Sequence, residues 1–193
     1  MRCFSCGKWS LKILCTRCQK TLFTPTFKTR QVGRLDVISF FRYATLEPLL
    51  LTKHTPVGYR LFRQMGHLYL RPFIQEYMEM DEGDVYIVGI DERVKAGYSH
   101  IATLTEAMRM PGVYVQHASL MAQNPVRYSG RPLQFRLENP RAFRYSGKEG
   151  INAILVDDIM TTGTTLQEAY TVLTRAGVNV LFALTLADVD EKA

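Results

Sequence analysis

Apolar positions along this chain fall into short continuous runs separated by longer amphipathic stretches. The runs are rich in β-branched and aromatic residues and predict strands at residues 37–43, 85–90, 113–115, 153–156 and 178–186. The stretches carry apolar residues at helical spacing and predict helices at residues 46–53, 58–80, 99–110 and 164–176. Strands that alternate with helices predict an α/β fold, with a mostly parallel sheet flanked by helices on both faces.

Two segments break this pattern. Residues 22–29 contain Pro25 and several threonines, which is typical of a linker. Residues 122–150 contain three prolines and three glycines and have no clear period. A structureless segment of that length in a compact domain is usually functional or disordered, so we expect an irregular loop there.

The length and composition are those of a globular protein. The chain has 193 residues, of which 47% are hydrophobic and 22% charged, which fits one main domain with a small appendage and argues against a fibrous or disordered chain. No apolar run approaches the ~20 residues that cross a bilayer, and no apolar core follows the first charge as in a secretory signal. We therefore expect a cytoplasmic protein without membrane insertion.

Positive charge is concentrated in the first part of the chain. Residues 1–80 contain 13 Lys and Arg against 4 Asp and Glu, a net charge of +9, whereas residues 81–193 contain 11 against 14, a net charge of −3. Six further cations crowd residues 127–148. This asymmetry favours an anionic partner, with nucleic acid as the first candidate. A basic face that only keeps the protein soluble explains the charge alone equally well.

All the cysteines lie at the front of the chain, in two Cys-x-x-Cys pairs separated by eight residues: Cys3, Cys6, Cys15 and Cys18. Each pair can turn both thiolates to one side, so four thiolates can surround one tetrahedral Zn²⁺. Disulfides would need an oxidising compartment, and a thioredoxin-type site needs a single pair on a βαβ unit. The spacing therefore predicts a structural zinc module at residues 1–24, followed by a larger domain at residues 25–193. We expect Phe4 and Trp9 to pack over the metal, the alternative being that they stack on bases.

The most informative segment runs from residue 154 to 165 and reads ILVDDIMTTGTT. An apolar strand ends at Asp157 and Asp158, and a hydroxyl-rich loop then leads into a helix. In a parallel sheet this places the acids and the loop at the carboxyl edge, where ligands bind. Backbone N–H groups and hydroxyls at a helix N-terminus can hold a phosphate, and carboxylates accept hydrogen bonds from a diol. A phosphate beside a sugar diol describes a ribose 5-phosphate.

These residues also have plain structural interpretations. The acids can be solvated residues at a strand end, although adjacent carboxylates repel each other and do not favour stability. One threonine is enough to cap a helix, so several around a glycine favour an anion site, formed by Thr161, Thr162, Gly163, Thr164 and Thr165. No lysine follows the glycine as in a Walker loop, and the glycine pattern is not that of a dinucleotide-binding loop.

Residues 154–165 resemble, at every position, the phosphoribosyl-pyrophosphate (PRPP) motif of type I phosphoribosyltransferases. This motif together with the two Cys-x-x-Cys pairs at the N-terminus makes the chain resemble the ComF/ComFC family of competence proteins. Residues 43–58, Gln123 and the run from Arg136 to Phe143 also resemble family segments. The chain departs from the family where residues 89–91 read Gly-Ile-Asp instead of Pro-Val-Pro and residues 98–100 read Tyr-Ser-His instead of Phe-Asn-Gln. Both departures fall in the region that resembles the pyrophosphate loop.

The resemblance implies a type I phosphoribosyltransferase-like domain with a zinc module and a role in natural transformation. Such a protein would bind incoming single-stranded DNA in the cytoplasm and use PRPP as ligand or co-substrate. A helicase or membrane channel of the DNA-uptake apparatus would be a further partner. The basic front is compatible with DNA binding through Lys8, Lys12, Arg17 and Lys20, with Trp9, Phe23 and Phe27 available for stacking.

A plain transferase is the alternative. It would move ribose 5-phosphate from PRPP, bound with Mg²⁺, to a nitrogen acceptor. Asp157 and Asp158 would stabilise the oxocarbenium-like ribose, and Arg136 with Mg²⁺ would take the charge of the leaving pyrophosphate. A third and weaker interpretation is a PRPP sensor without chemistry. The sequence indicates neither an acceptor nor a general base, and it favours an ordinary first-turn role for His100 over a ligand contact.

Overall fold

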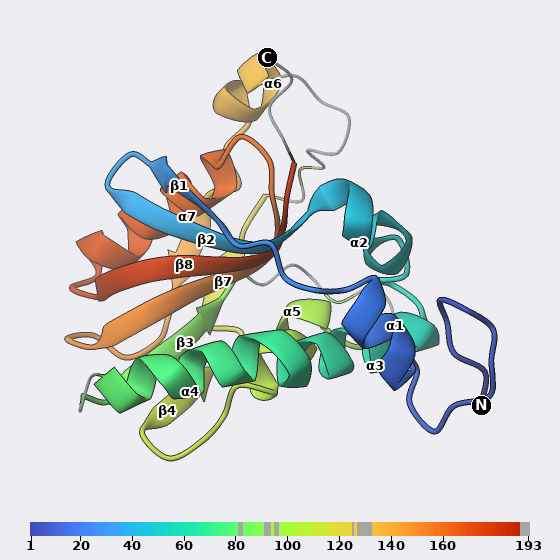
Figure 1. Ribbon diagram of the computed structural model, residues 1–193. Coiled ribbons are helices and arrows are strands. Elements are labelled where there is room, and N and C mark those ends of the chain that lie inside the picture. The colour runs from blue at the N-terminus through green and yellow to red at the C-terminus, as the bar shows by residue number, and fades with distance from the viewer. Residues whose placement is uncertain (81–82, 91–93, 95–96, 125, 127–132, 190–193) are drawn as a thin grey trace.

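The computed structural model describes residues 1–80, 83–90, 94, 97–124, 126 and 133–189, and these are built around one sheet of six strands (Figure 1). The strands lie in the order β1-β2-β8-β7-β3-β4, with β1 antiparallel to β2 and the other pairs parallel. Their bounds are β1 (Lys28–Val32), β2 (Leu35–Arg42), β3 (Val85–Gly89), β4 (Val113–Gln116), β7 (Asn152–Met160) and β8 (Asn179–Asp188). A separate antiparallel pair consists of β5 (Leu120–Ala122) and β6 (Phe143–Tyr145).

Helices cover both faces of the sheet (Figure 1). One face packs against α7 (Thr164–Arg175), and the other against α3 (Pro56–Met65), the π-helical turn η1 (Gly66–Leu70), α4 (Arg71–Met80) and α5 (His100–Glu106). The remaining helices are α1 (Thr16–Thr21), α2 (Tyr43–Leu50) and α6 (Leu133–Glu138). In the described ranges, no helix is both long and apolar enough to cross a membrane.

The apolar runs are continuous because both faces of the central strands are buried. On β7, Ala153 and Leu155 belong to the core beneath α7, whereas Ile154 and Val156 belong to the core beneath α3 and α5. Successive side chains of a strand point to opposite faces, so a strand covered on both sides needs apolar residues at every position. The predicted mostly parallel sheet with flanking helices is confirmed.

Residues 56–80 follow one continuous helical path. Its middle turn, η1, directly precedes Pro72, the second residue of α4. Because proline has no N–H and crowds the preceding turn, a widened π-helical turn accommodates it without ending the helix. Gly66 opens this turn and lies so close to α5 that a Cβ there would be 2.7 Å from the Leu104 carbonyl oxygen.

The structure corrects the sequence prediction in two segments. Residues 28–32 include the end of the predicted linker but form β1, and residues 122–150 contain α6 and β6 rather than a loop throughout. Elements of three to six residues offer too few repeats for a period to be detected. Arg127 and Arg131, two of the cations predicted to crowd this segment, lie outside the described residues.

The N-terminal segment is docked on the larger domain through α3 and η1 (Figure 1). Gln64 brackets Leu14, donating from Nε2 to the Leu14 carbonyl and accepting from the Leu14 N–H. Tyr69 donates its hydroxyl to the Phe23 carbonyl at 2.7 Å. Leu14, Cys18 and Phe23 are buried in the same core as α3. A boundary at residue 24 remains a prediction.

Candidate functional site

β3 and β7 lie side by side in the sheet, and the chain leaves them in opposite directions. From β3 it passes through α5 to the edge strand β4, and from β7 it passes through α7 to β8 on the other side. In open parallel sheets, ligands bind at the carboxyl ends of the strands at such a topological switch point. Asp157 and Asp158 lie in the last four residues of β7, and residues 161–165, here called the threonine loop, lie just beyond it.

The two acids lie inside β7 and not at its end. β7 continues to Met160, and its pairing with β8 places Asp157 opposite Thr185 and Met160 opposite Asp188. Asp158 is only 6% exposed. The prediction of a strand that ends at exposed acids is therefore wrong, because the residues after the acids continue the ladder with β8.

A lysine and a histidine hold the carboxylate of Asp158. Lys53 Nζ lies 3.0 Å from Asp158 Oδ2, and His100 Nε2 lies 3.3 Å from the same oxygen. Burial raises the pKa of Asp158, but His100 and Lys53 outweigh burial and hold this pKa below its ordinary value. Asp158 is therefore ionised at neutral pH. His100 is a buried partner of this acid, a role that the sequence analysis does not assign to it.

Asp157 differs from its neighbour in charge state. Its Oδ1 accepts a hydrogen bond from the Asp158 N–H at 2.8 Å. Burial and the negative charge of Asp158 raise the pKa of Asp157 well above its ordinary value, while the charges of Arg141 and Lys53 act in the opposite direction. The pair therefore carries one negative charge more readily than two. Because a protonated carboxyl also donates, such a pair can match both hydroxyls of a diol.

The threonine loop is shaped by a glycine that no other residue could replace without strain. Gly163 has a φ of +78° and caps the N-terminus of α7, and a Cβ there would lie 2.7 Å from Val32 Cγ2. The hydroxyls of Thr162 and Thr164 are 2.8 Å apart, one on each side of the glycine. Backbone N–H groups and threonine hydroxyls thus meet at the positive end of a helix whose first turn has no acidic residue. This arrangement suits an anion such as phosphate.

A second ionic cluster, which the sequence analysis missed, fixes the start of this loop. Arg30 Nη1 donates to the Thr161 carbonyl at 3.0 Å and lies 3.2 Å from Asp188 Oδ1. Lys28 Nζ lies 3.5 Å from the same carboxylate oxygen of Asp188, which is 1% exposed. Asp188 is the last residue of the apolar strand β8. The pattern that singled out Asp157 and Asp158, an acid at the end of an apolar run, could therefore have identified Asp188 as well.

The four cysteines form a cluster that fits one Zn²⁺. Their Sγ atoms lie within 4.8 Å of one another, and those of Cys6 and Cys15 are 3.7 Å apart. Sulfurs around a tetrahedral zinc at ~2.3 Å lie about 3.8 Å apart. Burial raises the pKa of the Cys3 thiol, but N–H groups of Cys15, Cys6 and Ser5 lower it to about 6, which favours the thiolate that binds metal.

The aromatic residues of the N-terminal segment do not form the expected small core. Trp9 is 79% exposed and Phe4 is 38% exposed, and the Arg2 guanidinium lies 6.0 Å from the Trp9 ring centroid. The cysteines and the contacts with α3 hold the segment instead. Phe27 is exposed, but Phe23 is buried, so Phe23 cannot stack on a base as suggested.

The remaining predicted site residues are spread over two regions. Arg136 lies in α6, but its side chain falls outside what the structure describes. The four predicted DNA-binding residues lie on the N-terminal segment with exposed side chains: Lys8, Lys12, Arg17 and Lys20. Their DNA-binding role stays a prediction.

Solved structures that resemble this chain are phosphoribosyltransferases. An adenine phosphoribosyltransferase aligns with a TM-score of 0.47 and 17% identity, covering 91% of this chain and 91% of that chain. The orotate phosphoribosyltransferase of Mycobacterium tuberculosis aligns with a TM-score of 0.41 and 12% identity, covering 89% and 82%. No family model and no curated protein matches the chain.

The strand order and the helices on both faces confirm the predicted α/β class with a mostly parallel sheet, and the cysteine cluster agrees with a small N-terminal metal module. The structural likenesses are distant, so the assignment of individual site residues rests on the geometry described above.

Replacing Gly163 with alanine should destabilise the protein more than the same change at Gly177. Both glycines have φ near +75°, but a Cβ at Gly177 meets nothing within 4 Å. Each change forces a left-handed alanine at about 1–2 kcal/mol, and Gly163→Ala adds about 1–3 kcal/mol for the collision with Val32. Urea denaturation measures both free energies of unfolding, and equal losses would contradict the close packing of Val32 on this loop.

We expect the protein to bind one Zn²⁺ per chain through its four cysteines. Cys18→Ser should release the metal and loosen residues 1–24, because so small a segment cannot hold a core without it. Elemental analysis of the reduced protein measures the metal, and limited proteolysis reports the loosening. Thr21→Ala, an exposed change on the same helix, should keep the zinc. Wild-type protein without stoichiometric metal would refute the site.

Proposed function

We propose that this chain binds PRPP at the carboxyl end of β7. The observation that supports this best is the pairing of two adjacent acids, one of them buried, with a glycine-centred threonine loop at the switch point of the sheet. The threonine loop would hold the 5-phosphate at the N-terminus of α7, through Thr161, Thr162, Gly163, Thr164 and Thr165. Asp157 and Asp158 would hold the two ribose hydroxyls. Mg²⁺ would arrive with the pyrophosphate of PRPP, whose charge it neutralises.

We also propose that the protein acts in natural transformation as a cytoplasmic DNA-uptake factor that binds single-stranded DNA. This role comes from the resemblance to ComF/ComFC proteins, which also implies a helicase or a membrane channel as a further partner. The zinc module would present Lys8, Lys12, Arg17 and Lys20 to the phosphate backbone. Trp9 and Phe27, both exposed, would be available to stack on bases.

A basic groove along α3 supports the DNA-binding proposal. One cavity, of about 470 Å³, separates the N-terminal segment from α3, and another, of about 590 Å³, separates α3 from α5. Both are lined by Tyr59, Arg63 and His67, and the two cavities are together called the α3 groove here. Lys12 and Arg60 line the first of them. Burial lowers the pKa of His67, and the charges of Arg63 and Arg71 lower it further.

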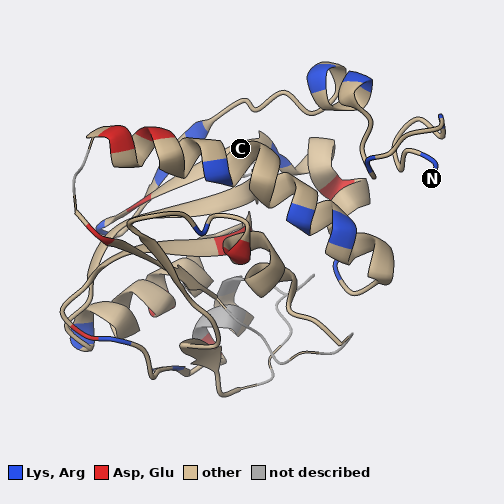
Figure 2. Ribbon diagram, turned by 90° about the horizontal axis from the view of Figure 1, so that it is seen from below, with Lys and Arg blue, Asp and Glu red and all other residues tan. Residues whose placement is uncertain are grey.

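The charge distribution along the same helical path agrees with this placement. Figure 2 shows basic positions on the half of the α3–α4 path nearest the N-terminal segment and acidic positions at its far end. Glu76 and Glu79 belong to that far end, in α4. A phosphate backbone would therefore be attracted to the end of the path that carries the α3 groove.

Phosphoribosyl transfer is the alternative function of the same site. Asp158, ionised and buried, would stabilise positive charge on the ribose as the bond to pyrophosphate breaks, and Asp157 would assist it. Arg136 with Mg²⁺ would take the charge of the leaving pyrophosphate, and a nitrogen acceptor would complete the reaction. Pyrophosphate release from PRPP, measured with and without single-stranded DNA, separates the two functions. Release favours transfer, whereas tight DNA binding without release favours the uptake role.

Asp157→Ala should weaken PRPP binding by about 10–100-fold, because it leaves a ribose hydroxyl without its partner in the site, at a cost of ~1–3 kcal/mol. The fold should tolerate the change, since burial already disfavours the ionised form of this side chain. Calorimetry with PRPP and Mg²⁺ gives the affinity, and thermal unfolding checks the fold. Asp36→Ala, an exposed acid on β2, should leave the affinity unchanged. Full affinity in folded Asp157→Ala protein would refute the ribose site.

Arg60→Glu with Arg63→Glu should weaken binding of a single-stranded oligonucleotide and flatten its dependence on salt. Contact with about four phosphates predicts a log–log salt slope near −3, at ~0.7 per phosphate. Arg34→Glu with Arg175→Glu makes the same charge change at exposed sites outside the α3 groove and should preserve most of the binding. Fluorescence anisotropy measures both variants. Salt-independent binding, or no binding at low salt, would contradict the proposal.

A further inference from the structure

The carboxylate of Asp158 is held by residues from two distant parts of the chain. Lys53 follows α2 and His100 begins α5, and both reach Asp158 Oδ2, at 3.0 and 3.3 Å. The side chains of His100 and Asp158 are 8% and 9% exposed, and that of Lys53 is 28% exposed. Both contacts engage the same oxygen of the acid, so Lys53 and His100 together restrict the orientation of the carboxylate.

Tyr98 ties the segment of Lys53 to the segment of His100. Its hydroxyl lies 2.7 Å from the Lys53 carbonyl oxygen and 2.9 Å from that of Thr55, so its one proton is shared between them. Gly58 also approaches this contact, since a Cβ there would lie 2.7 Å from the Tyr98 hydroxyl. The turn that carries Lys53 is therefore fixed by a residue two positions before His100.

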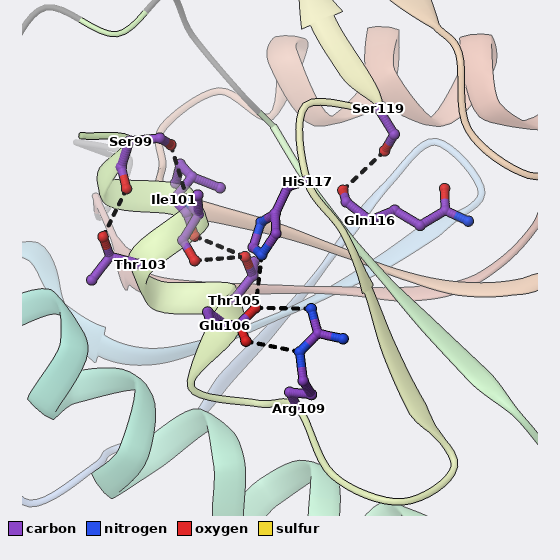
Figure 3. Close-up of polar contacts among 10 residues, drawn as sticks. Ser99, Ile101, Thr103, Thr105, Glu106, Arg109, Gln116, His117 and Ser119 are labelled. Carbon is purple, nitrogen blue, oxygen red and sulfur yellow. Dashed lines mark hydrogen bonds and ion pairs between the residues drawn. The ribbon is translucent and has the colours of Figure 1, made fainter. Parts of the chain in front are cut away.

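Helix α5, which carries His100, is itself fixed at both ends (Figure 3). At its start, Ser99 accepts from the Ala102 N–H at 3.0 Å, and Thr103 donates to the Ser99 carbonyl. At its end, Glu106 contacts Arg109 at 2.8 Å and His117 at 2.7 Å. These contacts leave His100 little freedom to move away from Asp158.

We infer that Tyr98, Lys53 and His100 form a positioning unit that orients the Asp158 carboxylate and keeps it ionised for the ligand's hydroxyls. The inference rests on the proposed PRPP site. It assigns a task to residues 98–100, the segment in which this chain reads Tyr-Ser-His. Tyr98 fixes the backbone of Lys53, and Lys53 and His100 fix the acid. The affinity of the site would therefore depend on a tyrosine that does not touch the ligand.

The pH dependence of such a site follows from the groups around Asp158. Its neighbours are Lys53, His100, Asp157 and, from α2, Tyr43, whose pKa is raised by burial, by Glu47 and by Asp158 itself. His54 packs edge-on against His100. The charge of Arg141 acts on the neighbouring acid, where it lowers the pKa of Asp157. Because the pKa of Asp158 is depressed, its ionised form persists as pH falls below the ordinary carboxyl range. Without Lys53, protonation would begin at a higher pH.

Calorimetry with PRPP and Mg²⁺, from pH 8 down to about pH 3, below the ordinary carboxyl pKa of ~3.9, tests the positioning unit. Tyr98→Phe should weaken binding by about tenfold through loss of the hydroxyl contacts. Lys53→Met should weaken it further and move the acidic fall in affinity upward by about one pH unit or more. His100→Gln retains a donor and should retain most of the affinity. Tyr114→Phe is the matched control, since it removes the hydroxyl of an exposed tyrosine on β4, and it should behave as wild type.

Two results would overturn the inference. Tighter PRPP binding in Lys53→Met would mean that Lys53 blocks the acid instead of positioning it. An acidic fall in affinity that Lys53→Met leaves unchanged, with Tyr98→Phe equal to Tyr114→Phe, would mean that the contacts are structural only. Carboxyl titration by NMR, on ligand-free wild type and Lys53→Met, gives an independent answer. If wild type binds no PRPP the proposed function fails, whereas an Asp158 pKa that Lys53→Met does not raise refutes the positioning unit itself.

Discussion

A charged carboxylate inside a parallel sheet is the constraint around which the rest of this molecule is arranged. An ionised acid buried without partners costs several kcal/mol, so Asp158 requires compensating side chains close by. The neighbouring strands supply no cation. The partners are Lys53, in the turn after α2, and His100, the first residue of α5. The placement of these two elements over the end of β7 is therefore tied to the charge of one side chain.

The same logic appears on the other side of the threonine loop. Asp188 ends β8 in a buried position and is held by Lys28 and Arg30. Arg30 also holds the carbonyl of Thr161, so the ionic cluster that compensates Asp188 also fixes the loop. In both clusters the cations that contact the acid come from the N-terminal part of the chain: Lys53 contacts Asp158, and Lys28 and Arg30 contact Asp188. This explains in part why so much positive charge lies before residue 80.

The central elements could be predicted from sequence because their signals are local. The apolar runs of β3 and β7 and the glycine before α7 identify the sheet and the loop without long-range information. The partners of the acids could not be predicted in this way. Lys53 is 105 residues from Asp158, and Arg30 is 131 residues from Thr161. No period or spacing encodes such contacts, and the burial of Asp158 became evident only from the continued pairing of β7 with β8.

The position of β1 in the sheet links the threonine loop to the least protected part of the fold. β1 is an edge strand that pairs only with β2, within the described residues, and it carries both Arg30 and the Val32 side chain that packs on Gly163. Edge strands open by local fluctuation at a lower free energy than the centre of a sheet. Each such opening removes two supports of the loop at once. The loop's amide protons should thus exchange with solvent on the timescale of the edge strand, even though α7 and β7 beside it remain closed.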